Sequence, residues 1–306
     1  MLKVKTVKII LLFFLFNDDL TMRFSIEQII QQFTQQLATN SDSAKLDVEL
    51  LLARSLGKDR TYLFTWSDKL VTEKEEVTFK ELFARRLKGE PIAYILGQQA
   101  FWDLELKTAE HTLIPRADTE TLIEWVLELA DALPECANVI DLGTGTGAIA
   151  LSLAHEFRQW NVQGVDLIPQ AVELAQHNAK LNQLEQVRFF QSSWFDQVEG
   201  QFDLVVSNPP YIDPDDEHLA QGDVRFEPKT ALVAENKGLA DLELIAEQSR
   251  DYLFDGGWLL MEHGYDQQEA VQQLLYKFGY QQVTTRIDLG GNPRITGGQF
   301  FKGAVV

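Results

Sequence analysis

The stretch VIDLGTGTG at residues 139–147, followed at once by AIAL at 148–151, is an apolar strand that runs through a glycine-rich turn into a helix. Three glycines at alternate positions let the backbone turn tightly and let a ligand approach the main chain without meeting Cβ atoms. We therefore predict that a nucleotide-like ligand contacts Gly143, Thr144, Gly145, Thr146 and Gly147. Dinucleotide sites, P-loops and methyltransferases share such a turn, so the turn alone does not identify the ligand.

Helices and strands alternate on both sides of this turn. Helices are predicted at 118–131, 147–157, 169–181, 238–253 and 267–278, and strands at 137–142, 161–166, 186–191, 202–207, 256–262, 280–287 and 295–302. Strands that alternate with helices at this spacing are typical of parallel βαβ units. The pattern predicts an α/β fold with a doubly wound, mostly parallel seven-stranded sheet.

The charge around the turn separates the ligands that it could hold. Residues 139–157 contain no lysine or arginine, so the lysine of a P-loop is missing. Ala148 and Ile149 stand where a dinucleotide-binding turn would have its last glycine, which disfavours a nicotinamide cofactor. S-adenosylmethionine carries a positive sulfonium and no phosphate, so a neutral to acidic pocket suits it. We therefore predict the class I S-adenosylmethionine methyltransferase fold, with this molecule as cofactor.

Asp166 ends the second predicted strand, where a carboxylate can accept hydrogen bonds from a ribose diol. Alone, the residue is equally well explained as a cap of the helix that begins near Pro169. Together with the glycine-rich loop, the ribose interpretation is favoured, and Asp166 is predicted to bind the cofactor.

The tetrapeptide Asn208-Pro209-Pro210-Tyr211 follows the strand predicted at 202–207, at the end of the strand where open α/β sheets bind ligands. The lone pair of an amide or exocyclic NH2 group is delocalised, so a catalyst must orient the nitrogen and accept its hydrogens. The Asn208 side-chain oxygen can accept one hydrogen and the Pro209 carbonyl the other, while Tyr211 can lie against the flat group. A rigid surface turn would explain the residue types but not their place in the sheet.

The chain before this domain is helical by pattern. Apolar residues recur at helical spacing from Ile26 to Leu37 and from Ala44 to Leu56, and a capping box at Thr72 opens a third helix that runs to Leu87. We predict a helical domain at 22–93, a hairpin linker at 94–115 and the methyltransferase domain at 116–306. Residues 1–21, basic and then apolar, are predicted to be an extension outside the fold that precedes a functional start at Met22; the alternative is an export or membrane-associating segment.

Composition limits the partners and the compartment. The formal charge of −19 on 306 residues would repel a phosphate backbone, so no direct binding of nucleic acid is expected. Cys136 is the single cysteine, which rules out an intramolecular disulfide and fits the cytoplasm. The five histidines show no metal-ligand spacing, so no metal is predicted; they are His111, His155, His177, His218 and His263.

From about Met22 to its end, the chain resembles the HemK/PrmC-type peptide chain release factor glutamine methyltransferases. The stretches that carry the resemblance are GEPIAY at 89–94, Phe101-Trp102, TLIPR at 112–116, DTE at 118–120, the loop at 143–147, SNPPY at 207–211, RFEP at 225–228 and Ala231-Leu232. Together they are far more specific than the Asn-Pro-Pro-Tyr tetrapeptide, which adenine methyltransferases also have.

The resemblance implies a reaction, a partner and site residues. The expected target is the side-chain amide nitrogen of the glutamine in the Gly-Gly-Gln loop of class I release factors. The loop at 143–147, Asp166, Trp194 and Asn208 would contact the cofactor, residues 208–211 would hold the glutamine, and the helical domain would help to dock the release factor onto a protein expected to be a monomer. Two residues depart from the family pattern, Ala117 in place of a proline and Ser193 in place of an aspartate, which puts the linker and one adenine contact in doubt.

Two other functions stay open at this point. An adenine methyltransferase acting on RNA or DNA could use residues 208–211 to hold a flipped base, although the net charge argues against it. A binding module without activity could keep the same fold. The sequence Gly297-Gly298-Gln299 matches the tripeptide of the expected substrate, and we interpret it as a coincidence within a terminal strand.

Overall fold

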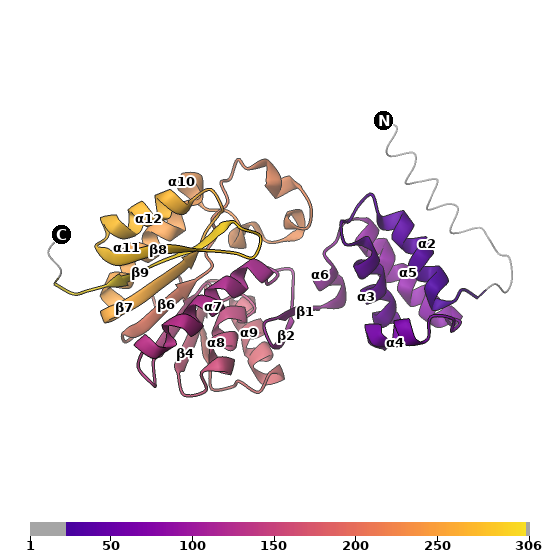
Figure 1. Cartoon of the computed structure of the whole chain (residues 1–306), viewed down its shortest axis with the longest axis horizontal. Helices are drawn as coiled ribbons and strands as arrows, with labels where there is room; N and C mark the ends of the chain where they lie inside the picture. Colours follow the sequence, from indigo (N-terminus) through magenta and orange to yellow (C-terminus); the bar gives the residue numbers. More distant parts are fainter. Residues whose placement is uncertain (1–22, 304–306) are drawn as a thin grey trace. The chain divides into compact units, whose positions relative to one another are not determined.

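The computed structural model describes residues 23–303, and the chain divides into two compact units between Ile92 and Ala93 (Figure 1). The extension predicted at 1–21 and the start predicted at Met22 lie outside the described residues. Within residues 23–303, no helix is both long and apolar enough to cross a membrane.

The first unit is built from α2 (Ile26–Leu37), α3 (Ala44–Leu56), α4 (Arg60–Thr65) and α5 (Glu73–Leu87). Thr72 forms the predicted capping box, Ser25 forms a second one, and Gly57 ends α3 in the left-handed conformation. Phe33 packs edge-on against Phe79 and Phe83, with ring centroids 4.8 Å away in both cases. The sequence pattern missed α4, because six residues are too few to show helical periodicity.

The second unit begins in α6 (Ile92–Leu96), another helix that the pattern missed, and continues through the predicted hairpin, β1 (Gln98–Phe101) and β2 (Leu104–Lys107). Next comes η1 (Ala117–Thr119), a short 3₁₀ helix that opens α7 (Glu120–Leu129). The helix expected at 118–131 is thus α-helical only in its middle, because η2 (Ala130–Ala132) ends it as a second 3₁₀ turn.

Seven strands form one sheet in the order β5-β4-β3-β6-β7-β9-β8. Their bounds are β3 (Asn138–Leu142), β4 (Asn161–Asp166), β5 (Arg188–Gln191), β6 (Phe202–Ser207), β7 (Leu253–Glu262), β8 (Tyr280–Ile287) and β9 (Pro293–Phe300). All neighbours up to β7 pair in parallel, whereas β9 pairs antiparallel with both β7 and β8. The doubly wound, mostly parallel sheet is confirmed, and the insertion of β9 between β7 and β8 is an arrangement that the pattern did not predict.

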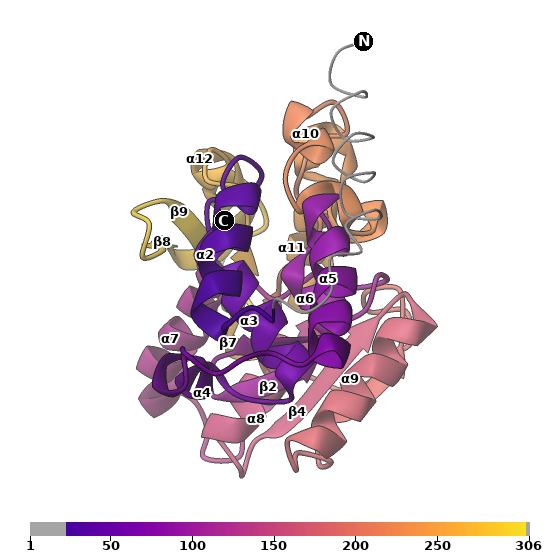
Figure 2. The ribbon, with the colours of Figure 1, turned by 90° about the vertical axis from the view of Figure 1, so that its right-hand side faces the viewer.

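Helices cover both faces of the sheet. The apolar side chains of α7, α8 (Ala148–Glu156) and α9 (Pro169–Leu181) pack into the core on one face, and α8 and α9 lie alongside β4 (Figure 1, Figure 2). The side chains of α11 (Ala240–Tyr252) and α12 (Gln268–Lys277) pack into the core on the other face. The loops that follow the central strands lie at the carboxyl ends of those strands.

A long connection separates β6 from α11. It contains three 3₁₀ helices, η3 (Glu217–Ala220), η4 (Val224–Phe226) and η5 (Lys229–Ala231), and the short α10 (Glu235–Gly238). None of these elements was predicted from the sequence, because turns of three or four residues leave no periodic pattern.

Candidate active site

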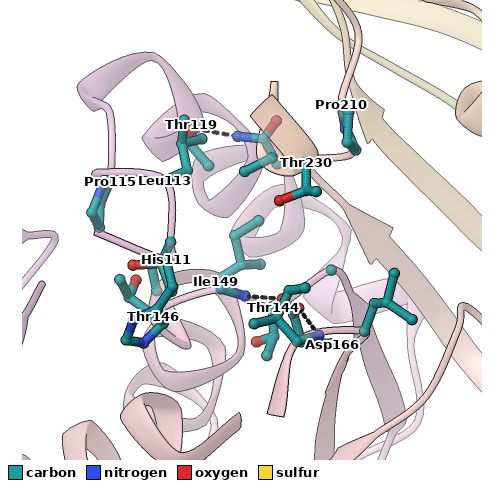
Figure 3. A pocket seen from close by; sticks show the side chains of 18 of the residues that line it. His111, Leu113, Pro115, Thr119, Thr144, Thr146, Ile149, Asp166, Pro210 and Thr230 are labelled. Carbon is teal, nitrogen blue, oxygen red and sulfur yellow. Dashed lines mark hydrogen bonds between the residues drawn. The ribbon is translucent and has the colours of Figure 1, made fainter. Parts of the chain in front are cut away.

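A cavity opens at the carboxyl ends of β3, β4 and β6. Its empty volume is about 1150 Å³ including the open mouth, which is ample for a cofactor-sized ligand. Residues 143–146, Asp166, Trp194 and Asn208 all line it, so the two sequence motifs open into one space. Figure 3 shows Thr144 and Asp166 on one side of the cavity and Thr119 and Pro210 on the other.

The glycine-rich loop needs its glycines for backbone conformation. Gly143, Gly145 and Gly147 have φ angles of +72°, +54° and +85°, values that L side chains rarely adopt. Gly143 lies against the Trp194 ring, whose nearest atom would be 3.4 Å from an added Cβ. Gly147 does not line the cavity; it begins α8 and packs near Phe189 instead.

Asp141 stabilises the glycine-rich loop through hydrogen bonds. Its Oδ2 accepts hydrogen bonds from the Thr144 hydroxyl at 2.6 Å and the Ala150 amide at 3.3 Å. The side chain is fully buried, and burial raises the pKa of Asp141 to about 7. Asp141 therefore supports the loop and does not line the cavity.

Asp166 joins the loop to the next helix. Its Oδ2 accepts from the Gly145 amide and its Oδ1 from the Ile168 amide, both at 2.9 Å, and burial raises the pKa of this carboxyl group. The capping contact to Ile168 and a place in the cavity wall thus occur together. Each carboxylate oxygen has a second lone pair, so the side chain can still accept from a bound diol.

Trp194 follows β5 and has an unusual φ of +45°. The side chain is half-buried, lines the cavity and makes a hydrogen bond to Asp241. Burial raises the pKa of Asp241, and the hydrogen bond from Trp194 offsets part of that rise. Ser193 has an exposed side chain and also lines the cavity. Asp241 is a cavity residue that the sequence analysis missed, because it lies in the first turn of α11 outside any motif.

The Asn-Pro-Pro-Tyr tetrapeptide is only partly in the cavity wall. Asn208 and Pro210 line the cavity, and the Asn208 Nδ2 donates to the Thr119 hydroxyl at 3.2 Å. Pro209 is buried, and Tyr211 donates its hydroxyl hydrogen to Glu262 at 3.1 Å. Neither Pro209 nor Tyr211 lines the cavity.

Comparison with known proteins gives the family. Two family models match the chain: the PrmC N-terminal domain at residues 28–97 and the methyltransferase small domain at residues 120–226. The release factor glutamine methyltransferase of Aliivibrio fischeri is 49% identical over 282 residues, which cover 91% of this chain and 99% of that protein. The protein of that name from Pseudomonas aeruginosa is 52% identical over 85% of this chain and 94% of its own length, and the one from Escherichia coli is 46% identical over 86% and 94%. The chain belongs to the release factor glutamine methyltransferase family.

As a member of this family, the chain is a methyltransferase that uses S-adenosylmethionine. Among solved structures, the hMettl16 catalytic domain in complex with MAT2A 3'UTR hairpin 1 has a TM-score of 0.51 at 16% identity, covering 78% of this chain and 86% of that chain. Likeness at that identity supports the fold alone.

The cavity of this family member fits the cofactor chemically. Among the described residues that line it, Arg116 is the one lysine or arginine, while Asp166 and Asp241 supply carboxylates. Such a wall suits a sulfonium cation and disfavours a polyphosphate. Gly143 and Gly145 line the cavity without a Cβ, so a ligand can approach the loop backbone at these two positions.

Arg116 connects the entrance of the methyltransferase domain to the connection after β6. Its Nη2 lies 2.5 Å from Oε1 of Glu227, whose side chain is fully buried. Burial raises the pKa of Glu227 to about 7, and its Oε2 has no hydrogen-bond partner within residues 23–303. Both residues belong to the stretches that carry the family resemblance, but their pairing was not predicted. Ala117, the departure from the family pattern, is the first residue of η1.

The sequence analysis missed Glu262 and the role of Thr119, although Thr119 lies in the stretch at 118–120 that carries the family resemblance. The Thr119 hydroxyl donates to Oε2 of Glu262 at 2.6 Å, although 143 positions separate the two. Glu262 is fully buried, and burial raises its pKa to about 6. No motif joins them, so only the three-dimensional arrangement reveals the contact.

Proposed function

We propose that this chain transfers the methyl group of S-adenosylmethionine to the side-chain amide nitrogen of the glutamine in the Gly-Gly-Gln loop of class I peptide chain release factors. The observation that carries the proposal is that Asn208 opens into the same cavity as residues 143–146. The names of the relatives, release factor glutamine methyltransferases, support the choice of substrate.

The residues that would hold the cofactor are residues 143–146, Asp166, Trp194 and Asn208, with Asp166 accepting hydrogen bonds from the ribose. When bound, S-adenosylmethionine supplies an electrophilic methyl group on a positively charged sulfur. The backbone of the loop stays accessible because its glycines have no side chain. Gly147 would act indirectly, by seating the start of α8.

Asn208 would hold the glutamine amide. Because its Nδ2 donates to Thr119, its Oδ1 is the atom free to accept an N–H of the substrate. The Pro209 carbonyl would accept the other hydrogen, and Pro209 and Pro210 reduce the freedom of this backbone. Tyr211, expected to lie against the flat amide group, does not line the cavity, so it would act indirectly, by anchoring this loop through its hydrogen bond to Glu262. The amide proton can leave after the methyl group has transferred, so the proposal assigns no strong general base.

The first unit would help to dock the release factor. The hairpin linker at 94–115 would connect this docking unit to the methyltransferase domain. The match of the PrmC N-terminal domain to residues 28–97 supports a role for this unit that is shared across the family. A net charge of −19 suits a protein partner with a basic loop better than a nucleic acid. We further propose that the enzyme acts as a monomer in the cytoplasm, without a metal.

The test is methyl transfer to purified release factor. Labelled cofactor is incubated with a release factor carrying its loop glutamine and with the same protein carrying alanine there. Label is expected in the first protein only. Label in both, in neither, or in added RNA or DNA would contradict the proposal. In a second test, Asn208→Ala is expected to lower kcat by about two orders of magnitude and to leave cofactor binding largely intact.

A further inference from the structure

The elements β6, β7 and η1 bring the buried carboxylate of Glu262 close to Asn208, with Thr119 between the two side chains. In the sheet, Ser207 of β6 pairs with Met261 of β7. The residues that come next, Asn208 after β6 and Glu262 at the end of β7, therefore lie side by side at the carboxyl ends of neighbouring strands. The end of η1 places Thr119 between them. The Thr119 hydroxyl donates to Glu262 Oε2 at 2.6 Å and accepts from Asn208 Nδ2 at 3.2 Å. The second of these bonds is the dashed line at Thr119 in Figure 3.

The direction of these bonds follows from the single hydrogen of a hydroxyl group. An ionised carboxylate can only accept, so the Thr119 hydrogen must point at Glu262. The Thr119 oxygen can then only accept from Asn208, which requires the NH2 end of the Asn208 amide to face it. The Oδ1 end is consequently turned away from Thr119, as a hydrogen-bond acceptor for the cavity.

We propose that ionised Glu262, acting through the Thr119 hydroxyl, fixes which way round the Asn208 amide stands, and that Glu262 and Thr119 are positioning residues for the methyl transfer. The inference rests on the proposed function, because the orientation matters only if Asn208 Oδ1 accepts an N–H of the substrate. Glu262 does not line the cavity, so it acts without touching the substrate.

Protonation of Glu262 reverses the chain of hydrogen bonds. A proton on Oε2 would be donated to Thr119, whose own hydrogen would then point at Asn208. The Asn208 amide would turn its oxygen to Thr119 and present NH2 to the cavity, where it would oppose the N–H groups of the substrate. Loss of one oriented acceptor of this kind typically costs about 100-fold in turnover.

The surroundings of Glu262 place this change of protonation near pH 6. Burial raises its pKa to about 6, with a smaller raising effect from Asp118. The hydrogen bonds from Thr119 and Tyr211 and the charge of Arg294 act in the opposite direction. Arg294 lies on β9 and is itself held by Asp288 at 3.1 Å and Asp118 at 3.4 Å. His263, the next residue, is buried and hydrogen-bonded to Thr296, and burial lowers its pKa, which disfavours a positive charge beside Glu262.

The experiment measures kcat, KM for release factor and cofactor affinity between pH 5 and pH 8 for the wild type and five variants. Thr119→Val, which removes the hydroxyl at nearly constant shape, is expected to lower kcat by about 10- to 100-fold. Thr119→Ser, which keeps the hydroxyl, should restore most of that loss. Thr121→Val makes the same change in a buried residue of α7 outside the cavity and should leave kcat unchanged.

Glu262→Gln is expected to lower kcat to a similar extent and to remove the pH dependence. The wild-type kcat should fall as the pH drops below about 6, whereas the kcat of Glu262→Gln should be flat there. The double variant Thr119→Val/Glu262→Gln should lose little more than either single variant, because both changes break one chain of bonds. Cofactor affinity should change by no more than roughly threefold in all variants.

The outcomes separate this inference from the function. If the wild-type enzyme fails to methylate the loop glutamine, the proposed function is wrong. If wild-type transfer occurs but Thr119→Val keeps its kcat, or Thr119→Ser is as poor as Thr119→Val, the positioning role is wrong and the function stands. Persistence of the fall in kcat below about pH 6 in Glu262→Gln would likewise overturn the role of this carboxylate.

Discussion

Gly238 packs closely against the backbone of the Asn-Pro-Pro-Tyr loop and lies outside the cavity wall. It ends α10 with a φ of +78°, and a Cβ added to it would lie 2.0 Å from the Tyr211 carbonyl oxygen and 2.8 Å from Nε2 of Gln267. The same Gln267 Nε2 donates to that carbonyl at 2.9 Å and to the Lys237 carbonyl at 3.2 Å. We predict that Gly238→Ala displaces the tetrapeptide.

The size of the displacement follows from the contact. Real Cβ atoms essentially never approach another heavy atom closer than 3.0 Å, so an atom placed at 2.0 Å requires a shift of at least about 1 Å. The added Cβ is fixed to the backbone at the end of α10, and the atom that it overlaps is the backbone carbonyl oxygen of Tyr211. No side-chain rotation can therefore relieve the overlap. A misplacement of about 1 Å typically lowers turnover by about 100-fold. Left-handed strain adds about 1 kcal/mol, and loss of the Gln267 bond about 1 kcal/mol more.

The assay compares Gly238→Ala with Gly200→Ala. Gly200 has a φ of +94° and is exposed, and an added Cβ would have no neighbour within 4 Å in the part of the chain that the structure describes. Its variant therefore carries the backbone strain without the overlap. We expect urea unfolding to show a loss of about 1 kcal/mol for Gly200→Ala, with kcat unchanged. Gly238→Ala should lose about 2 kcal/mol or more, and its kcat should fall by about 100-fold while the protein stays folded.

The reasoning would be refuted by a folded Gly238→Ala enzyme with a kcat within about twofold of the wild type. Equal effects of the two variants on kcat would also refute it, because strain and not overlap would then be the cause.

Three more predictions concern buried charges. Asp166→Asn should weaken cofactor binding by about 10-fold or more in calorimetry, with little change in unfolding, and unchanged affinity would remove its assigned role. The pKa of Asp141 is raised to about 7, so its contribution to stability is present at low pH and is lost as the pH rises towards 7. The stability of Asp141→Asn relative to the wild type should therefore rise between pH 4 and pH 7, and a constant difference would contradict the assigned pKa. Arg86 donates to Asp47 at 2.7 Å with both side chains buried, so Arg86→Leu should cost about 3 kcal/mol in urea unfolding, and a loss under about 1 kcal/mol would count against it.

The elements that the sequence predicted best are those with local signals. The capping box at Thr72 and the proline at the start of α9 each mark the start of a helix through contacts only a few residues long. The position of β9 between β7 and β8 could not be predicted in this way, because strand order depends on pairing between distant segments.

The same distinction applies to the site. The glycines at 143–147 and the prolines at 209–210 show in the sequence because they serve the backbone itself. Thr119, Asp241 and Glu262 are ordinary residues of a helix end, a helix and a strand, and they gain a role only through neighbours brought by folding. A threonine and a glutamate 143 positions apart cannot be paired from one sequence.

Gly297-Gly298-Gln299 shows how a motif can mislead without its structure. These residues lie within β9, where all three pair with β7, and Gly297 and Gln299 also pair with β8. An added Cβ on Gly297 would lie 2.3 Å from a Leu260 side-chain atom, so close packing explains that glycine. With both edges of the strand hydrogen-bonded, the tripeptide belongs to the sheet, which agrees with its interpretation as a coincidence.

The order of the strands explains why the parts of the site meet. Because β3, β6 and β7 are consecutive neighbours and parallel, the residues that follow or end them, Gly143, Asn208 and Glu262, stand in a row along one edge of the sheet. The first would contact the cofactor, the second would hold the substrate amide, and the third would set the orientation of the second. Each neighbouring pair is joined by the rigid hydrogen bonds of the sheet, so a shift of one strand would disturb all three functions together.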